Sequence, residues 1–234
     1  MNKPVLKIDW ATYEAAKYAC ENWHYSGCIP STQCKIGVWE DGKFIGVVLF
    51  GIGAGNSTSG IRYGLNKKGE VAELVRVALR SHKTPVSKII KIALVMMKKQ
   101  NPGIRLVISF ADNMGQGHVG WIYQAGNWIY AGAFDGNVGF IIHGKIVHSK
   151  TVGERGWKQS VEWIQRNIDP KCRKAETYKH RYLMPLDAEM RERIAPLAQH
   201  YPKRVKKQDS ECPSELGGAV PTDTLQNAAV NPAE

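Results

Sequence analysis

Side chains that could transfer protons or groups gather in one short segment of the sequence. Ser109 and Asp112 end an apolar, strand-like run, and a glycine-rich turn separates them from His118 and Tyr123. In an open α/β sheet, ligands bind at the carboxyl ends of strands, so these side chains should face one crevice. A phenol with a pKa of about 10 can protonate a leaving thiolate or ribose alkoxide, which makes Tyr123 the predicted general acid. The alternative is structural: Asp112 would cap a helix and Tyr123 would lie in the core.

A second candidate pair, His24 and Tyr25, directly follows the first predicted helix. Such side chains can carry protons or stack on a planar ligand, so we regard them as candidate site residues. Either Asp112 or His24 would then accept the proton that the substrate loses. The alternative is that His24 caps the helix and Tyr25 packs against its neighbours. No Ser-His-Asp or Cys-His spacing indicates a covalent intermediate, although the nearness of His118 to Ser109 keeps that alternative open.

Glu73 and Arg76 fall on one predicted strand but with opposite parity. In a regular strand they would face opposite sides of the sheet, whereas a β-bulge between them would turn both toward the same side. An arginine in a buried strand needs an anionic partner, so we expect Arg76 to bind the donor or cofactor.

The elements that position these residues follow from hydrophobic periodicity and turn signals. Asp41-Gly42 between two β-branched runs predicts a hairpin, Asn101-Pro102-Gly103 ends an amphipathic helix, and Asp9 is a candidate helix cap. The order of elements predicts an α/β fold, a mixed central sheet flanked by helices that changes from antiparallel to parallel pairing. The predicted strands are 5–9, 34–39, 44–50, 72–80, 105–110, 128–133, 138–142, 146–148 and 178–183, and the predicted helices are 11–23, 86–99, 118–125, 156–168 and 187–200.

The charge of the chain indicates a polyanionic partner. The 234 residues include 32 Lys and Arg against 21 Asp and Glu, a formal charge of +11. Five of the acids lie in residues 209–234, which hold no Lys or Arg, so residues 1–208 carry a formal charge of +16. Such a field attracts nucleic acid, although a basic surface that serves only solubility is the alternative.

Composition divides the chain into a body and a tail. We predict one catalytic domain over residues 1–208, with C-terminal additions from about residue 150, and a disordered acidic tail over 209–234 that is dispensable for chemistry. No stretch is long and apolar enough for a membrane span, and no membrane partner is expected. The five scattered cysteines form no CxxC pair, which favours a reducing, intracellular compartment such as the cytoplasm.

Four segments carry a resemblance to a known family: Glu21–Ser26, Glu73–Arg76, Ser109–Asp112 and Gly117–Ala125. With the order of elements, they resemble the GNAT acyltransferase fold and, more closely, the bacteriophage Mom family of DNA-modification proteins, over about residues 5–185. The resemblance implies conversion of DNA adenine to N6-(carbamoylmethyl)adenine, which shields phage DNA from host restriction. It also implies a ferrous iron site that draws on Tyr25 and Asp112, although tyrosine is an uncommon ligand and no 2-His-1-carboxylate spacing is present.

The predicted donor-side loop departs from ordinary GNAT enzymes, which hold the pyrophosphate of coenzyme A with a glycine-rich loop. Here the loop, Arg80–Lys88, has no glycine, and Pro85 removes one amide donor. The start of the following helix could still bind an anion with help from Lys88. We therefore assign donor or cofactor binding to the polar side chains of this segment, which are Arg80, Lys83, Ser87 and Lys88. Acyl-CoA is one candidate donor, and an RNA end is another.

Three functions compete at this stage. The first is a Mom-like transferase that acts on unstacked adenine in DNA, with an activated glycine donor such as glycyl-tRNA, because glycyl transfer followed by rearrangement gives the implied connectivity. The second is a conventional GNAT acetyltransferase acting on a small-molecule or protein amine. The third is a non-catalytic nucleic-acid-binding domain. Aromatic residues that could stack on a base are Trp23, Tyr25, Trp39, Tyr63, Trp121 and Trp128.

Overall fold

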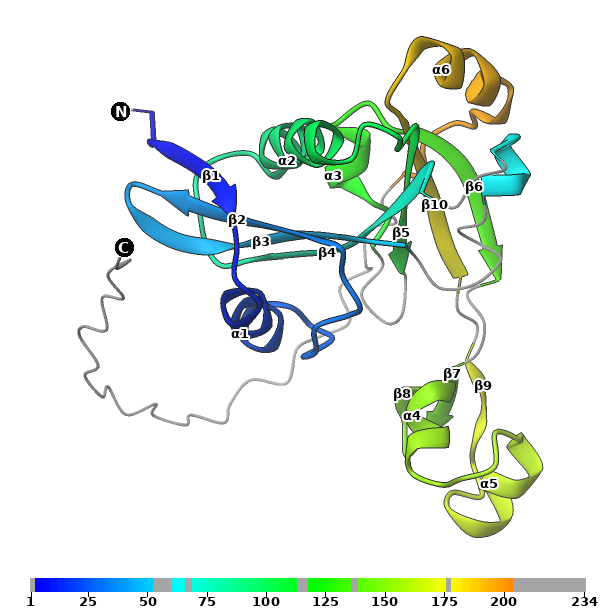
Figure 1. Cartoon of the computed structure of the whole chain (residues 1–234). Coiled ribbons are helices and arrows are strands. Elements are labelled where there is room, and N and C mark those ends of the chain that lie inside the picture. Colours follow the sequence, from blue (N-terminus) through cyan, green and yellow to red (C-terminus); the bar gives the residue numbers. More distant parts are fainter. Residues whose placement is uncertain are drawn as a thin grey trace, which may run out of the picture. The chain divides into compact units, whose positions relative to one another are not determined.

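The computed structural model describes residues 3–52, 60–65, 69–112, 118–135, 139–175 and 178–203. The first elements are β1 (Leu6–Trp10), α1 (Tyr13–Trp23), β2 (Cys34–Glu40) and β3 (Lys43–Gly51) (Figure 1). All three strands pair antiparallel in chain order. The predicted hairpin is confirmed, because Asp41 and Gly42 both have positive φ, at 51° and 77°. The cap of α1 is Thr12 and not Asp9, since the Thr12 side chain accepts from the Ala15 amide.

Parallel pairing begins between β4 (Val71–Leu79) and β5 (Leu106–Asp112), which α2 (Val86–Gln100) connects. The recorded pairs run from Val71–Leu106 to Glu73–Ile108. Beyond that point β4 continues along β3, whereas β5 continues along β10. The two central strands therefore part at their carboxyl ends, where ligands bind in open sheets.

The seven-stranded sheet has the order β1-β2-β3-β4-β5-β10-β6. Strand β10 (Tyr178–Pro185) enters between β5 and β6 (Ile129–Asp135) and pairs antiparallel with both. The predicted mixed α/β sheet flanked by helices, with its change from antiparallel to parallel pairing, is confirmed. The insertion of β10 was not predicted, because nothing in its local sequence specifies two non-local partners.

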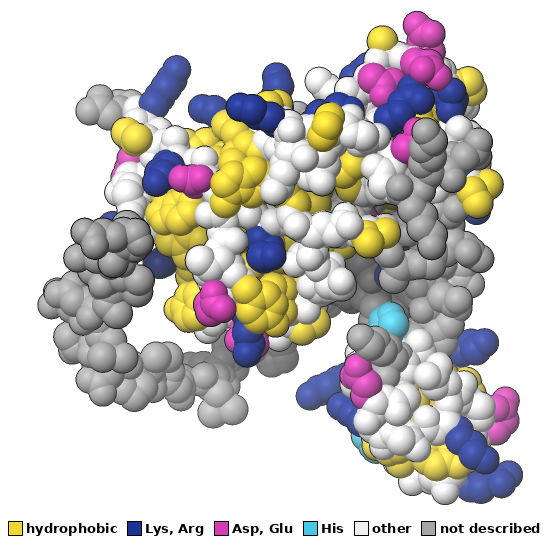
Figure 2. All heavy atoms as spheres, in the orientation of Figure 1, with side chains coloured by type: hydrophobic (Ala, Val, Ile, Leu, Met, Phe, Trp, Pro, Cys, Tyr) yellow, Lys and Arg dark blue, Asp and Glu magenta, His cyan; other side chains and the backbone are white. Residues whose placement is uncertain are grey.

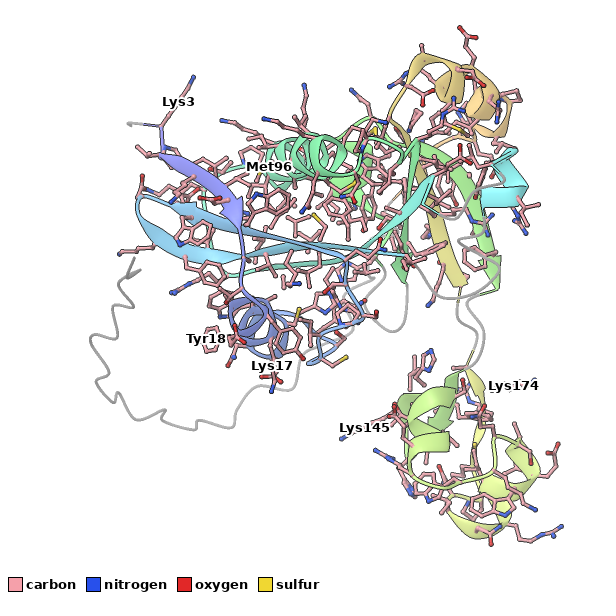
Figure 3. The ribbon with its side chains drawn as sticks, viewed as in Figure 1. Lys3, Lys17, Tyr18, Met96, Lys145 and Lys174 are labelled. Carbon is pink, nitrogen blue, oxygen red and sulfur yellow. The ribbon has the colours of Figure 1, made fainter. Side chains whose placement is uncertain are left out.

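Helices α1 and α2 cover opposite faces of the sheet (Figure 1). Ala16 and Cys20 of α1 pack with Val47 and Leu49 of β3. The alternate residues of β3, Val48 and Phe50, point to the other face and join Ile89, Ala93 and Met97 of α2 in the largest core cluster. Met96, labelled in Figure 3, packs at the edge of that cluster.

A second, three-stranded sheet has the order β8-β7-β9. It comprises β7 (Gly139–Ile142), β8 (Lys145–His148) and β9 (Arg173–Ala175), with α4 (Ser149–Glu154) and α5 (Val161–Asn167). Phe140, Ile142, Val152, Ile164 and Cys172 form its core. The helix predicted over 156–168 is shorter than expected: Gly156 has a φ of +73° after α4, and α5 begins only after Ser160, whose side chain caps it by accepting from the Trp163 amide.

Two further helices are shorter than predicted. The helix expected over 118–125 is only α3 (Trp121–Gln124), because Gly120 adopts a left-handed conformation in front of it. The helix expected over 187–200 is α6 (Ala188–Ile194), capped by Asp187 and followed by a 3-10 turn, Ala195–Leu197. No helix in the described ranges could cross a bilayer. The predicted boundary at 208 and the acidic tail lie outside the described residues.

Candidate functional site

A pocket of about 420 Å³ opens where β4 and β5 part. Both central strands line it, and so do the segment after α1 and the start of α3. His24, Tyr25, Arg76 and Tyr123, all predicted from the sequence as functional residues, are brought together here. Their separation in the chain shows that the fold, and not sequence proximity, assembles this pocket.

A β-bulge in β4 brings Glu73 and Arg76 to the same pocket. Leu49 of β3 pairs with Arg76 and Phe50 pairs with Leu74, which leaves Val75 as the extra residue. The bulge cancels the parity mismatch between positions 73 and 76, and both side chains line the pocket. The predicted bulge is therefore confirmed.

Arg76 offers the pocket an unsatisfied donor. Its Nη1 donates to the Val75 carbonyl at 2.9 Å. Its Nε is buried and has no hydrogen-bond partner in the described part of the chain. A buried charged donor that makes no hydrogen bond costs free energy. An acceptor atom on a bound ligand would supply the missing hydrogen bond to Nε.

His24 is held as a neutral imidazole with a defined tautomer. Burial and the neighbouring charges of Arg76 and His118 lower its pKa to about 4. The Ser26 amide donates to Nδ1 at 3.2 Å, so Nδ1 is unprotonated, and the Ser26 hydroxyl lies 2.8 Å from the same atom. A neutral imidazole that accepts at Nδ1 carries its proton on Nε2. His24 is therefore suited to donate a hydrogen bond from Nε2 rather than to accept a proton there.

Tyr25 joins His24 and His118 in a group of rings. The Tyr25 ring centroid lies 4.3 Å from that of His24 and 6.4 Å from that of His118. As the structural alternative proposed, His24 is the C-cap residue of α1. Tyr25, however, is 66% exposed and is not packed into the core. Its ring is accessible to a ligand that enters the pocket.

Tyr123 and Ser109 form a buried hydroxyl pair. The two oxygens are 2.8 Å apart, and the Ser109 hydroxyl also donates to the Leu74 carbonyl at 2.9 Å. Ser109 is fully buried and does not line the pocket, whereas Tyr123 does. Burial raises the pKa of Tyr123 to about 12, so the phenol keeps its proton at neutral pH, as a general acid must.

Three of the six predicted stacking residues lie at the pocket: Trp23, Tyr25 and Trp121. Trp121 is 56% exposed. Tyr63 and Trp128 are buried in core clusters, so the prediction that they are base platforms is wrong. Trp39 packs against Phe44 and does not line the pocket.

The predicted donor-side residues Arg80, Lys83, Ser87 and Lys88 do not line the pocket. The guanidinium of Arg80 lies over the ring of Trp23, 5.6 Å from its centroid. Ser87 is half-buried in the first turn of α2, and Lys83 and Lys88 are exposed. Of the five residues assigned to donor or cofactor binding, only Arg76 reaches the pocket.

The loop before α2 does not fit a pyrophosphate, because Glu40 already occupies its amides. The amides of Lys83 and Thr84 donate to Oε2 and Oε1 of Glu40, both at 2.8 Å. The Thr84 hydroxyl donates to Oε1 at 2.6 Å. These hydrogen bonds lower the pKa of Glu40, which keeps the carboxylate ionised. Sequence reasoning missed Glu40, since no spacing rule links the end of β2 to a loop 43 residues later.

The described side chains do not form an iron site. Among them, no group of three or more His, Cys, Asp or Glu residues could hold a metal ion. Tyr25 contacts two histidine rings, and the side chain of Asp112 lies outside the described part.

Lys179 of β10 is a pocket residue that the sequence did not predict. Its backbone pairs with that of Asp112 at the end of β5. Only the non-local insertion of β10 brings this lysine to the pocket, and no motif around it could have indicated that position.

The chain matches one known protein family, and its fold is similar to that of solved acetyltransferases. A sequence model described as the Mom protein family matches residues 5–203. No curated protein matches the chain. A solved N-acetyltransferase from Staphylococcus aureus shares 13% identity, with 78% of this chain and 99% of that chain covered and a TM-score of 0.43. A GNAT family acetyltransferase from Elizabethkingia anophelis with acetyl-CoA bound shares 9% identity, with 77% and 98% covered and a TM-score of 0.42.

Proposed function

Because this chain belongs to the Mom protein family, whose model spans residues 5–203, we propose that it is a transferase that modifies adenine in DNA. The product would be N6-(carbamoylmethyl)adenine, and its role would be to protect phage DNA from host restriction. The observation that carries the proposal is the pocket between β4 and β5. It combines exposed aromatic rings with an unsatisfied arginine donor and a buried phenol.

A base must leave the helix before such a pocket can surround its exocyclic amine. Trp23, Tyr25 and Trp121 border the pocket and offer flat surfaces for an unstacked purine. The formal charge of +16 on residues 1–208 supplies affinity for the phosphate backbone. We expect DNA binding that weakens steeply as salt increases.

The donor in this proposal is an activated glycine, with glycyl-tRNA as the carrier. Adenine N6 attacks the glycyl carbonyl, an N6–C bond forms, and the ester bond to the ribose oxygen breaks. The amine of the new glycyl group then attacks C6 through a five-membered ring, and the original C6–N6 bond breaks. The former N6 becomes the terminal amide, which gives the carbamoylmethyl connectivity without an oxidant or reductant. Ring closure of this size gains from proximity, so it needs little further catalysis.

Four residues of the chain would each have a different role in the acyl transfer. Tyr123, whose pKa is raised to about 12, would protonate the leaving ribose oxygen. Arg76 would bind the carbonyl oxygen as negative charge develops on it, which would satisfy its buried Nε. His24 would donate from Nε2 to the substrate, and Asp112 would accept the N6 proton.

Acyl-CoA is the alternative donor, for a conventional acetyltransferase. Acetyl transfer to N6 would give an N-acetyl product, which lacks the nitrogen of a carbamoylmethyl group. The contact of Glu40 with the loop before α2 also disfavours a pyrophosphate at that position. We therefore prefer the glycyl donor.

Mass analysis of nucleosides tests the function directly. DNA from cells that express the chain should contain adenosine with the mass of an added carbamoylmethyl group, and DNA from cells expressing Tyr123→Phe should contain at least about 100-fold less of it. Glycine with heavy nitrogen should place the label on the nitrogen bonded to the purine ring. Label confined to the terminal amide would refute the rearrangement, and unmodified DNA from cells with abundant folded protein would refute the function.

A further inference from the structure

The outer face of α2 is a lysine-rich surface that the pocket does not use. Lys88, Lys91 and Lys99 are exposed on this helix, and Val95 between them is 65% exposed. Positions 88, 91, 95 and 99 are three, four and four residues apart, which places these four side chains on one face of the helix. Ile89, Ala93 and Met97 occupy the opposite, buried face. Figure 2 shows Lys and Arg side chains in dark blue over α2.

The positive charge of this segment is not neutralised by nearby acids in the sequence. Residues 80–105 contain no Asp or Glu, and their basic residues are Arg80, Lys83, Lys88, Lys91, Lys98, Lys99 and Arg105. Lys98 donates to the carbonyls of Pro102 and Ile104, and Arg105 pairs with Asp187. No recorded ion pair among the described residues includes Lys88, Lys91 or Lys99. These three ammonium groups therefore remain available to a polyanion.

The length of the face suits an extended strand better than a single phosphate group. From Lys88 to Lys99 the helix rises about 16 Å. A stacked nucleic acid strand advances about 3.4 Å per nucleotide, so the face can follow roughly five phosphates. The loop in front of the helix is already engaged, because Glu40 accepts from the amides of Lys83 and Thr84.

The position of α2 distinguishes between the two nucleic acids of the proposed reaction. The segment after α1, with His24 and Tyr25, borders the pocket where the DNA base would enter. Helices α1 and α2 cover opposite faces of the sheet (Figure 1). We place the duplex on the α1 side, next to His24 and Tyr25, which leaves the outer face of α2 to the other polyanion, the carrier of the donor.

We propose that the lysine face of α2, formed by Lys88, Lys91 and Lys99, binds the phosphodiester backbone of the RNA that carries the acyl donor. This inference rests on the RNA-linked donor of the proposed function. It assigns the RNA to a protein surface, whereas the proposed function assigns only the chemistry in the pocket. Phosphodiester contacts along the side of the helix would replace the pyrophosphate contact at its head.

The test compares two triple variants of the full chain with the same change in charge. The first carries Lys88→Glu, Lys91→Glu and Lys99→Glu on α2. The control carries Lys145→Glu, Lys171→Glu and Lys174→Glu, all exposed residues of the segment that forms the second sheet; Figure 3 labels Lys145 and Lys174. Binding to deacylated glycine-accepting tRNA and to a DNA duplex is measured over a range of salt concentrations.

The α2 variant should bind the tRNA at least about tenfold more weakly than the wild type. Because three phosphate contacts are lost, the slope of log K against log salt concentration should fall by about two to three. Its DNA binding should match that of the control variant. Equal tRNA binding by the two variants would overturn the inference, and so would a parallel loss of DNA and tRNA binding by the α2 variant alone. Thermal unfolding of both variants identifies any loss that comes from misfolding.

The two proposals fail in distinguishable ways. If the wild type modifies DNA but the α2 variant binds tRNA and modifies DNA as the wild type does, the inference fails and the function stands. If the wild type binds tRNA through α2 but leaves adenine unmodified, the proposed function fails and the surface stands.

Discussion

Glu40 accepts two hydrogen bonds from Thr84, one from its amide at 2.8 Å and one from its hydroxyl at 2.6 Å. The pair joins the end of β2 to the loop before α2. A carboxylate here makes the contacts that an anionic ligand would make to a helix-start loop. The chain thus supplies its own anion where the resemblance implied the pyrophosphate of a cofactor.

Replacing Glu40 with Gln should destabilise the fold. A glutamine amide can accept from one of the two loop amides but must present its own N–H groups to the other donor. We expect the melting temperature to fall by about 3–6 °C at pH 7. The pKa of Glu40 is lowered in the folded state. Its contribution to the free energy of unfolding is therefore present at pH values above the pKa of the unfolded chain and is lost as the pH falls through the folded pKa. The deficit of the variant should therefore shrink in acid. Glu21→Gln, an exposed change, is the control, and equal melting temperatures for both variants would contradict the account.

Arg76→Lys tests the unsatisfied donor in the pocket. Lysine keeps the positive charge but loses the planar Nε donor, which is the buried atom without a described partner. We expect the rate of adenine modification to fall by about 30- to 100-fold, with DNA affinity and melting temperature nearly unchanged. Arg173→Lys, on the second sheet, should modify DNA at the wild-type rate. A loss of modification matched by a loss of melting temperature would indicate a structural role instead.

The sequence predicted the parts of the fold that local chemistry determines. Asp41-Gly42 specifies its turn because both residues must adopt positive φ. The bulge at Val75 could be inferred because Glu73 and Arg76 have incompatible parity on any regular strand. His24, Tyr25 and Tyr123 were found through motifs at the ends of elements, where ligands bind.

Other features depend on contacts between distant segments, which local patterns do not encode. The place of β10 between β5 and β6 is set by tertiary packing, and with it the position of Lys179. In the sequence Glu40 is an ordinary hairpin residue, and only the tertiary fold brings the loop that contains Thr84 to it. The helix predicted over 156–168 followed the apolar period but began too early, because Gly156 has a positive φ and Ser160 is the residue that caps the helix.

Variants of Tyr123 and Ser109 should distinguish a catalytic residue from one that only positions it. Tyr123→Phe removes the predicted acid, and we expect modification to fall by about 100-fold or more. Ser109→Ala leaves the phenol in place, so the loss should stay within about tenfold. Urea denaturation of the two single variants and the double variant should give a coupling energy of about 1 kcal/mol, since either single change already removes the hydrogen bond between the two hydroxyls. Full activity of Tyr123→Phe would show that Tyr123 only packs in the core and is not the general acid.

His24 should make the folded state sensitive to acid. Its pKa is lowered to about 4 in the folded protein, whereas an unfolded histidine titrates near 6.5. Between these values the unfolded chain binds more protons, so the free energy of unfolding falls as the pH is lowered from about 6.5 toward 4. Because His24 is only half-buried, we expect a loss of about 1 kcal/mol between pH 6.5 and pH 5.

The variant His24→Asn isolates this contribution to the pH dependence. The asparagine carbonyl can still accept from the Ser26 amide, but it does not titrate. Denaturant unfolding at a series of pH values should show that His24→Asn loses about 1 kcal/mol less than the wild type over the same range. His200→Asn, an exposed change near the end of the described chain, should keep the wild-type slope. If His24→Asn also kept that slope, folding would not lower the pKa of His24, which would contradict the burial of a neutral imidazole at this position.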